Sequence, residues 1–173
     1  SVLPALPSST DGRAIPQGIN NKGHIVGVSS NGTNPWLGVV WVDGQIKALP
    51  FTAKYRSSSA GAINNLGDII GSVESATDKG SFPVIWERQS YKMRVLQRLT
   101  KYFTAPTAIN ENRLAVGYGN YPDGDGILFH AVGWKADGSV VDLGTLAGGV
   151  SSAAQGINGA GVDALGQARL TIG

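Results

Sequence analysis

The sequence contains no cysteine, which excludes disulfides, thiolate nucleophiles and cysteine-based zinc sites. Charge is also scarce, because only 15% of the residues are charged and the net charge is +2. So small a charge does not predict a nucleic-acid partner. No apolar run approaches the roughly 18 residues that a membrane-spanning helix requires, and no signal-peptide pattern follows Ser1. We therefore expect neither nucleic-acid binding nor a transmembrane segment.

Catalytic signatures are equally few. The chain has two histidines, His24 and His130, and no G-x-S-x-G nucleophile elbow, so a serine hydrolase is not expected. Its 12 acidic residues are scattered, and the sequence places no pair together as glycoside hydrolysis requires. Both histidines are interpreted as ordinary packed or exposed side chains. The sequence thus predicts a protein that is not an enzyme and has no cofactor.

Glycine and apolar side chains are abundant. The chain has 25 glycines, and hydrophobic residues make up 42% of it. This mixture predicts frequent turns and an all-β protein. A length of 173 residues suits one domain with a substantial core. We therefore expect a single domain over residues 1–173.

The pattern I-N-x-x-G, or a close relative of it, occurs four times along the chain. Its asparagines are spaced by 44, 46 and 48 residues, and Arg113 replaces the glycine in the third copy. Tryptophans recur in step, at intervals of 45 and 48 residues. The two series are Asn20, Asn64, Asn110 and Asn158, and Trp41, Trp86 and Trp134. Two independent markers with one period indicate an internal repeat.

Each copy predicts four short strands. The first precedes the asparagine, the second is an apolar pair ending in glycine, the third leads to the tryptophan, and the fourth follows a turn. The residue two positions before each asparagine is small: Gly18, Ala62, Ala108 and Gly156. A first strand with so little bulk indicates close neighbours.

The repeated residues are interpreted as structural. A tight hairpin needs residues that tolerate positive φ, and an asparagine side chain bonds its own backbone, which suits the Asn and Gly of the pattern. The tryptophans occupy one register of one strand, which favours aromatic packing between neighbouring sheets. The alternatives are that the asparagines contact a ligand and that the tryptophans form a binding platform.

Four-stranded units of about 40 to 50 residues that meet through a crowded strand are typical of propeller blades. The predicted fold is a small β-propeller of about four four-stranded blades, with the small strands lining the axis. Val2 to Leu6 resembles a fourth strand, and the last unit is too short for four strands. We expect this N-terminal strand to pair around Ala164 to Ile172 and close the last blade. The units are residues 14–50, 58–99, 104–146, and 152–173 with 1–8.

The chain resembles a known family, the bacterial HAF repeats, whose units look like G-I-N-x-x-G-x-I-V-G followed by H-A-F-x-W and D-L-G-T-L. Gln17 to Gly27, His130 to Trp134 and Asp142 to Leu146 match this pattern. The resemblance implies an extracellular, cell-surface or periplasmic location, often within larger surface proteins such as autotransporter passengers, and no established activity. Leu37 and Phe82 occupy the position of His130 in the other units, so a repeated histidine site is not expected.

Candidate ligand-binding residues fall into three groups. Trp36 lies outside the repeated register, and a singular aromatic residue in a loop is a candidate contact. Lys92 and Arg94 belong to the most basic stretch, which would contact anionic glycans or else form a solvated outer strand. The strands predicted to line the axis contribute Gln17, Thr107 and Gln155.

A weak metal candidate is the pair Asp123 and Asp125, whose oxygens are closely spaced as in a calcium loop. The bidentate glutamate of such loops is missing, and a glycine-rich hairpin is the favoured interpretation.

The leading functional hypothesis is a non-catalytic recognition or adhesion module that binds a glycan or a surface protein through its loops or an axial channel. A passive structural spacer is the main alternative, and a glycan hydrolase is the third. Exposed apolar or aromatic patches favour binding, whereas a perturbed carboxylate in a central pocket favours an enzyme. The sequence does not predict the oligomeric state.

Overall fold

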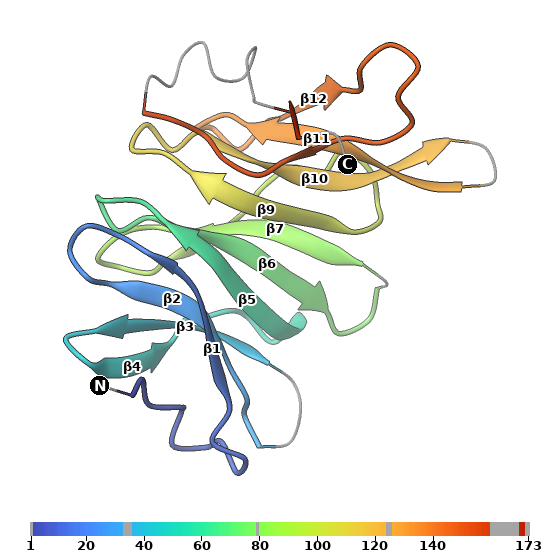
Figure 1. Cartoon of the computed structure of the whole chain (residues 1–173). Coiled ribbons are helices and arrows are strands. Elements are labelled where there is room, and N and C mark those ends of the chain that lie inside the picture. The colour runs from blue at the N-terminus through green and yellow to red at the C-terminus, as the bar shows by residue number, and fades with distance from the viewer. Residues whose placement is uncertain (1, 33–35, 79, 124–125, 160–169, 172–173) are drawn as a thin grey trace.

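The computed structural model describes residues 2–32, 36–78, 80–123, 126–159 and 170–171. Within these residues the chain forms strands and turns and no helix, which confirms the all-β prediction. Three antiparallel sheets have four strands each, and a fourth sheet has two (Figure 1). In every four-stranded sheet the strands follow one another in chain order, so each pairs with the strand before it.

The strand bounds agree with the expected positions before the first three asparagines and before each repeated tryptophan, whereas the strand expected before Asn158 is limited to two residues. The first sheet consists of β1 (Ala14–Ile19), β2 (Ile25–Ser29), β3 (Leu37–Val42) and β4 (Gln45–Ala48). The second consists of β5 (Tyr55–Ile63), β6 (Ile69–Ser75), β7 (Ser81–Trp86) and β8 (Met93–Val95). The third consists of β9 (Thr104–Ile109), β10 (Ala115–Asp123), β11 (Gly126–Trp134) and β12 (Val140–Gly144). The two-stranded sheet pairs β13 (Ala153–Ala154) with β14 (Leu170–Thr171).

The turn after the first strand of each sheet needs a residue with positive φ. Gly23 and Gly67 provide it with φ of 76° and 100°, and Arg113 provides it in the third sheet with φ of 61°. Glycine adopts this conformation without strain, whereas arginine adopts it at a cost. The predicted role of the glycine in the turn is therefore confirmed, and Arg113 is an exception that needs a compensating contact.

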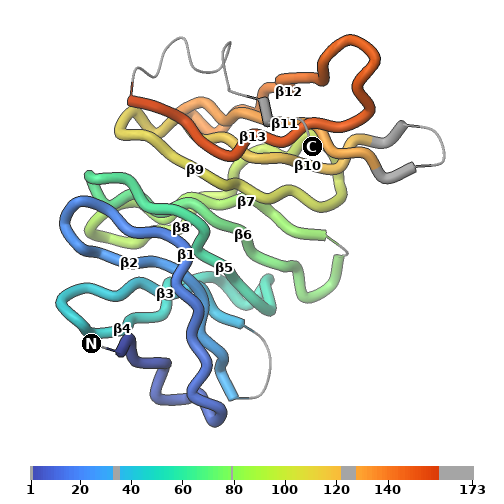
Figure 2. The backbone as a smooth tube through the Cα atoms, in the orientation of Figure 1, coloured from blue at the N-terminus to red at the C-terminus, as the bar shows by residue number. Residues whose placement is uncertain are grey.

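The sheets stack in chain order, from the first in blue to the third in orange (Figures 1 and 2). The first strand of each sheet forms the junction with the sheet before it. Strand β5 contacts β1, β2 and β3, strand β9 contacts β5, β6 and β7, and strand β13 contacts β10 and β11. The hydrophobic core is thus divided among the junctions between successive sheets.

The three repeated tryptophans lie in this core. Trp41, Trp86 and Trp134 are at most 1% exposed, so their predicted burial is confirmed. Each indole Nε1 donates a hydrogen bond to a backbone carbonyl that lies 36 or 37 residues earlier in the chain. The acceptors are Pro4 (2.8 Å), Pro50 (2.8 Å) and Gln97 (2.7 Å). A buried indole N–H needs such an acceptor, and the segment before each sheet supplies it.

The expectation for the N-terminal segment is corrected. Val2–Leu6 lies in no strand, and it covers the first sheet instead of joining the last unit. The Pro4 carbonyl binds Trp41, and Leu6 N donates to Ser29 Oγ at 3.0 Å. Prolines at positions 4 and 7 also remove the N–H groups that a strand would contribute to a ladder. The expected partner segment lies outside the described residues except for β14, which pairs with β13.

Candidate binding cavity

The first strands of the sheets surround a cavity of about 450 Å³. Its lining comes from β1, β5, β6, β9 and β10, from Phe103 just before β9, and from the segment after β13. The lining residues are Gln17, Ser59, Gly61, Gly71, Ser72, Phe103, Ala105, Pro106, Thr107, Tyr118 and Gln155. Residues of all four predicted units therefore meet at one place.

Backbone bulges project residues into this cavity. The pairing of β1 with β2 skips Gln17, the pairing of β5 with β6 skips Gly61, and the pairing of β9 with β10 skips Thr107. A bulge breaks the strict alternation of a strand and redirects one side chain. The skipped residue is in each case the third before the repeated asparagine, and Gln155 stands at this distance from Asn158. Three of the six candidates chosen from the sequence, Gln17, Thr107 and Gln155, thus line the same cavity.

The glycine at the third position of the second strand of each four-stranded sheet makes the bulge possible. A Cβ at Gly27, Gly71 or Gly117 would overlap the carbonyl oxygen of the bulged strand beside it. Glycine is the residue that permits so close an approach of two backbones. The repeated apolar pair ending in glycine therefore has a geometric cause that the sequence pattern alone did not reveal.

The cavity wall is polar without being charged. Its hydrogen-bonding side chains are two amides, three aliphatic hydroxyls and one phenol: Gln17, Gln155, Ser59, Ser72, Thr107 and Tyr118. Thr107 Oγ1 lies 2.6 Å from the Ala154 carbonyl and 3.1 Å from the Val116 carbonyl, so its hydrogen is engaged. Thr107 is then available to a ligand only as an acceptor, while the glutamine amides offer both donors and acceptors.

Aromatic rings form one side of the cavity. Phe103 and Tyr118 line it with ring centroids 6.0 Å apart, and Phe129 packs edge-on against both, at 6.5 Å and 5.6 Å. These contacts fix the two rings, and Phe103 remains 41% exposed. Sequence reasoning missed Phe103 and Tyr118 because neither belongs to a repeated series. The available signal was that Tyr118 follows the strand glycine where Val28 and Ser72 stand in the other sheets.

Trp36 lies outside the cavity lining. Its ring is half-buried, and the Arg13 guanidinium carbon lies 5.2 Å from the ring centroid. Its carbonyl accepts a hydrogen bond from Ser58 N at 3.1 Å, which ties the first sheet to β5. The structure thus gives Trp36 local packing partners.

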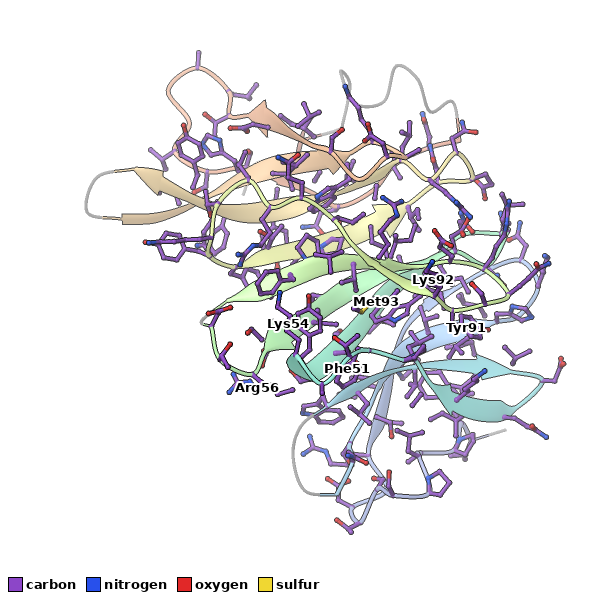
Figure 3. All side chains as sticks on the ribbon, turned by 180° about the vertical axis from the view of Figure 1, so that it is seen from behind. Phe51, Lys54, Arg56, Tyr91, Lys92 and Met93 are labelled. Atoms are coloured by element: carbon purple, nitrogen blue, oxygen red, sulfur yellow. The ribbon has the colours of Figure 1, made fainter. Side chains whose placement is uncertain are left out.

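Lys92 and Arg94 also lie apart from the cavity lining. Lys92 is exposed in the turn between β7 and β8, beside Tyr91 and Met93 (Figure 3). Both terminal nitrogens of Arg94 donate to carbonyls of the third sheet, to Asp137 and to Ala136, each at 2.9 Å. Arg94 therefore joins two sheets, and Lys92 is the solvated member of the pair.

The repeated asparagines connect the sheets in a ladder. Each Nδ2 donates to the backbone carbonyl of the next asparagine, at 3.0 Å from Asn20 to Asn64, 2.9 Å from Asn64 to Asn110, and 3.1 Å from Asn110 to Asn158. Each Oδ1 accepts backbone N–H groups of its own turn, such as His24 N at 3.0 Å. The sequence pattern indicated the turn contacts and gave no sign of the bonds between sheets.

A buried ion pair strengthens this ladder. The side chain of Asp68 is fully buried and receives both Arg113 Nε (3.1 Å) and Arg113 NH2 (2.9 Å). Burial raises the pKa of the Asp68 carboxyl, but hydrogen bonds from Arg113, Arg88 N and Asn64 outweigh this, so the pKa lies below its ordinary value. The same bond raises the pKa of Arg113. This pair is the contact that compensates Arg113 for its positive φ.

Among the described residues, His130 contacts Asp142 and Tyr121, and no group of metal ligands forms. His130 Nδ1 lies 3.0 Å from Asp142 Oδ2, and its ring stacks on Tyr121 with centroids 4.1 Å apart. Within the described part of the chain, no three His, Asp or Glu side chains gather as metal ligands. Asp125 and the side chain of Asp123 lie outside the described residues.

A second groove, of about 560 Å³, lies where Tyr91 of the second sheet faces β3 and β4. Its polar residues include Asp43, Gln45 and Lys47, and Lys47 Nζ lies 5.2 Å from the Tyr91 ring centroid. Burial raises the pKa of the Tyr91 hydroxyl. Residues of only two sheets meet here, so the cavity at the first strands remains the better candidate.

In comparisons with known proteins, no protein-family model, curated protein or solved structure matches this chain. Within the described residues, the structure has no helix long and apolar enough to cross a membrane. The chemistry of the cavity is therefore the main guide to function.

Proposed function

We propose that this protein is a non-catalytic recognition module that binds a neutral glycan in the cavity formed by the first strands. The observation that carries this proposal is the uncharged wall of amides and hydroxyls beside the rings of Phe103 and Tyr118. A sugar presents hydroxyls that both donate and accept hydrogen bonds, and C–H faces that pack on aromatic rings. Apolar surface with a few placed polar groups is the usual composition of such sites.

The absence of charge from the described lining favours a neutral sugar over an anionic one. An anionic glycan would need a guanidinium or ammonium group within the cavity to offset the loss of its hydration. Arg94, a guanidinium predicted to contact anionic glycans, instead donates hydrogen bonds from its terminal nitrogens to the Asp137 and Ala136 carbonyls. The same lining holds no carboxylate to act as a general acid, which disfavours the glycan hydrolase.

The architecture that we propose is a propeller-type array of repeat units, with the cavity on its axis. Three successive four-stranded sheets and the meeting of all four units at the cavity support it. The likeness to HAF repeats is part of the same proposal, as is the extracellular, cell-surface or periplasmic location that it implies. Glycan recognition suits that location, and a passive spacer would leave the cavity without a ligand.

A glycan array followed by calorimetric titration with the best oligosaccharide tests the proposal. Gln17→Ala should weaken binding about fivefold to tenfold, the equivalent of one hydrogen bond. The matched control is Gln45→Ala, which removes an exposed amide from the second groove and should leave affinity unchanged. Failure of every neutral glycan to bind, or an equal effect of the control, would overturn the proposal and leave the spacer as the better hypothesis.

A further inference from the structure

Two cations of the second sheet lie close to one aromatic ring, that of Phe82 in β7. The guanidinium carbon of Arg98 is 3.8 Å from the ring centroid, and Lys54 Nζ is 5.7 Å from it. A buried tyrosine, Tyr55, packs edge-on against the same ring with the centroids 5.8 Å apart. Both cations are within the range at which a ring face attracts positive charge. The second sheet therefore holds one ring in place where two positive charges converge.

Stacking and one hydrogen bond orient the Arg98 guanidinium. Its Nη1 donates to the Lys101 carbonyl at 2.8 Å, and no residue in the described part of the chain accepts from its Nε or Nη2. These two nitrogens form the edge of a guanidinium that binds carboxylates and phosphates in pairs. Arg113 uses this same edge for Asp68, at 3.1 Å from Nε and 2.9 Å from Nη2. The equivalent edge of Arg98 thus offers two fixed donors to a ligand.

The charges at Phe82 are not balanced by contact with a carboxylate. The neighbouring Arg56 pairs with Glu74 at 3.1 Å, whereas among the described residues neither Lys54 nor Arg98 forms an ion pair. Burial lowers the pKa of Arg98, and the charge of nearby Asp78 opposes this shift without contact. Two cations and one acid at longer range leave an excess of positive charge beside the ring.

We propose that Arg98 and Lys54 form a binding site for the phosphate of a phosphomonoester beside the ring of Phe82. The Nε–H and Nη2–H groups of Arg98 match two oxygens of this phosphate, and the Lys54 ammonium adds a second positive charge. A phosphomonoester carries a charge of about −1.5 to −2 at pH 7 and has three acceptor oxygens. Two cations therefore suit it better than a carboxylate, which carries a single charge.

The site belongs to a part of the sequence that the proposed glycan recognition leaves unused. Arg98 stands in the basic stretch that also contains Lys92 and Arg94. Lys92 is solvated, and Arg94 donates to carbonyls of the third sheet. The proposal moves the anion contact predicted for this stretch from these two residues to Arg98. It does not rest on the cavity, because neither Arg98 nor Lys54 belongs to the cavity lining.

Calorimetric titration with inorganic phosphate at constant ionic strength tests the site. The wild type should bind one phosphate per chain. Arg98→Lys keeps the charge but loses the paired donors, so affinity should fall about tenfold. Lys54→Met keeps most of the side-chain length and should also weaken binding. The matched control is Arg56→Met, since Arg56 flanks Tyr55 on the same side of the sheet as Lys54 and is paired with Glu74 (Figure 3). The control should bind phosphate like the wild type, and thermal melts show that each variant is folded.

Two further measurements test the charge balance and the carrier of the phosphate. Asp78→Asn removes the acid that acts on Arg98, so phosphate affinity should rise about twofold to threefold. Glucose 6-phosphate that binds more tightly than inorganic phosphate assigns the group to a sugar, whereas equal affinity assigns the site to phosphate alone.

Two outcomes overturn the proposal. A wild type without saturable phosphate binding would leave the two cations as packing partners of Phe82. Equal losses of affinity in Arg56→Met and Arg98→Lys would mean that phosphate responds to surface charge in general and not to the paired donors of Arg98.

Discussion

At the residue scale, one buried hydroxyl lacks a hydrogen-bond partner among the described residues, and a proline explains it. Thr104 Oγ1 lies at the junction of the second and third sheets. The equivalent hydroxyls of the other junctions accept a backbone N–H: Ser58 from Gly38 at 2.8 Å and Ser152 from Ala131 at 2.9 Å. Like Gly38 and Ala131, Pro83 is the third residue before a repeated tryptophan, but it has no N–H to donate.

Thr104→Val should therefore stabilise the protein. Valine has nearly the shape of threonine and removes the unpaired hydroxyl, whose burial costs about 1 to 3 kcal/mol. The free energy of unfolding from urea titration should rise by about 1 kcal/mol. Ser58→Ala is the control, and it should lower stability because it deprives Gly38 N of its acceptor. A destabilised Thr104→Val variant would mean that the hydroxyl has a partner, such as a bound water.

The pair of Asp68 and Arg113 predicts the response to acid. Because the folded pKa of Asp68 lies below its unfolded value of about 3.9, the carboxylate stabilises the fold above that pH and loses this contribution as the pH falls through the folded pKa. The free energy of unfolding, measured at about pH 7 and at about pH 3, should therefore fall less for Asp68→Asn than for the wild type as the pH is lowered.

The Arg113→Gly variant shows whether the ion pair or the strain of the positive φ has the larger effect on stability. Glycine relieves the positive φ, yet it leaves the Asp68 charge buried without its cation, so a net loss of about 3 kcal/mol is expected at neutral pH. The exposed pair of Arg56 and Glu74 is the control, and Arg56→Ala should change stability little. An Arg113→Gly variant as stable as the wild type would show that turn strain and ion pair cancel.

At the scale of elements, the glycine at the third position of β2, β6 and β10 is what allows the bulged first strand to lie so close. Gly71→Ala should destabilise the fold by about 1 to 3 kcal/mol, because its Cβ would overlap the Ser59 carbonyl. Gly156→Ala is the control, since no atom lies within 4 Å of a Cβ there. Thermal melts compare the two variants, and equal melting temperatures would contradict the packing argument. Displacement of Ser59 should also reduce glycan affinity in Gly71→Ala.

The strands were predictable because alternation and turn residues act locally. The burial of Trp41 and its two counterparts was predictable for the same reason, since one register of one strand faces one side. The sequence did not reveal the bulges at Gln17 and Thr107 or the asparagine ladder. These features depend on how closely the backbones of separate strands approach one another, which a local pattern does not encode. Of the polar lining, the sequence predicted Gln17, Thr107 and Gln155, which stand at one fixed distance from the asparagines, and it missed the serines and the aromatic side of the cavity.

At the scale of the whole molecule, stability is shared along a row of junctions. Each hydrophobic cluster joins two successive sheets, or a sheet and the segment beside it. In arrays whose units contact only their neighbours, loss of one junction acts mainly on the adjoining unit. Loss of the contact between the N-terminal segment and the first sheet should therefore destabilise mainly the first sheet, and this can be tested.

Deletion of residues 1–8 removes the Pro4 carbonyl and Leu6, which leaves the indole N–H of Trp41 unpaired and its ring exposed. The first sheet should lose about 3 to 5 kcal/mol, the sum of a lost buried leucine and an unmade hydrogen bond. Native-state hydrogen exchange should show lower protection in β2 and β3 and unchanged protection in β10 and β11. Leu6→Ala is the milder control and should act on the same strands. If the N-terminal segment instead completed the last unit, protection would also fall around β13, and the assignment of this segment to the first sheet would be wrong.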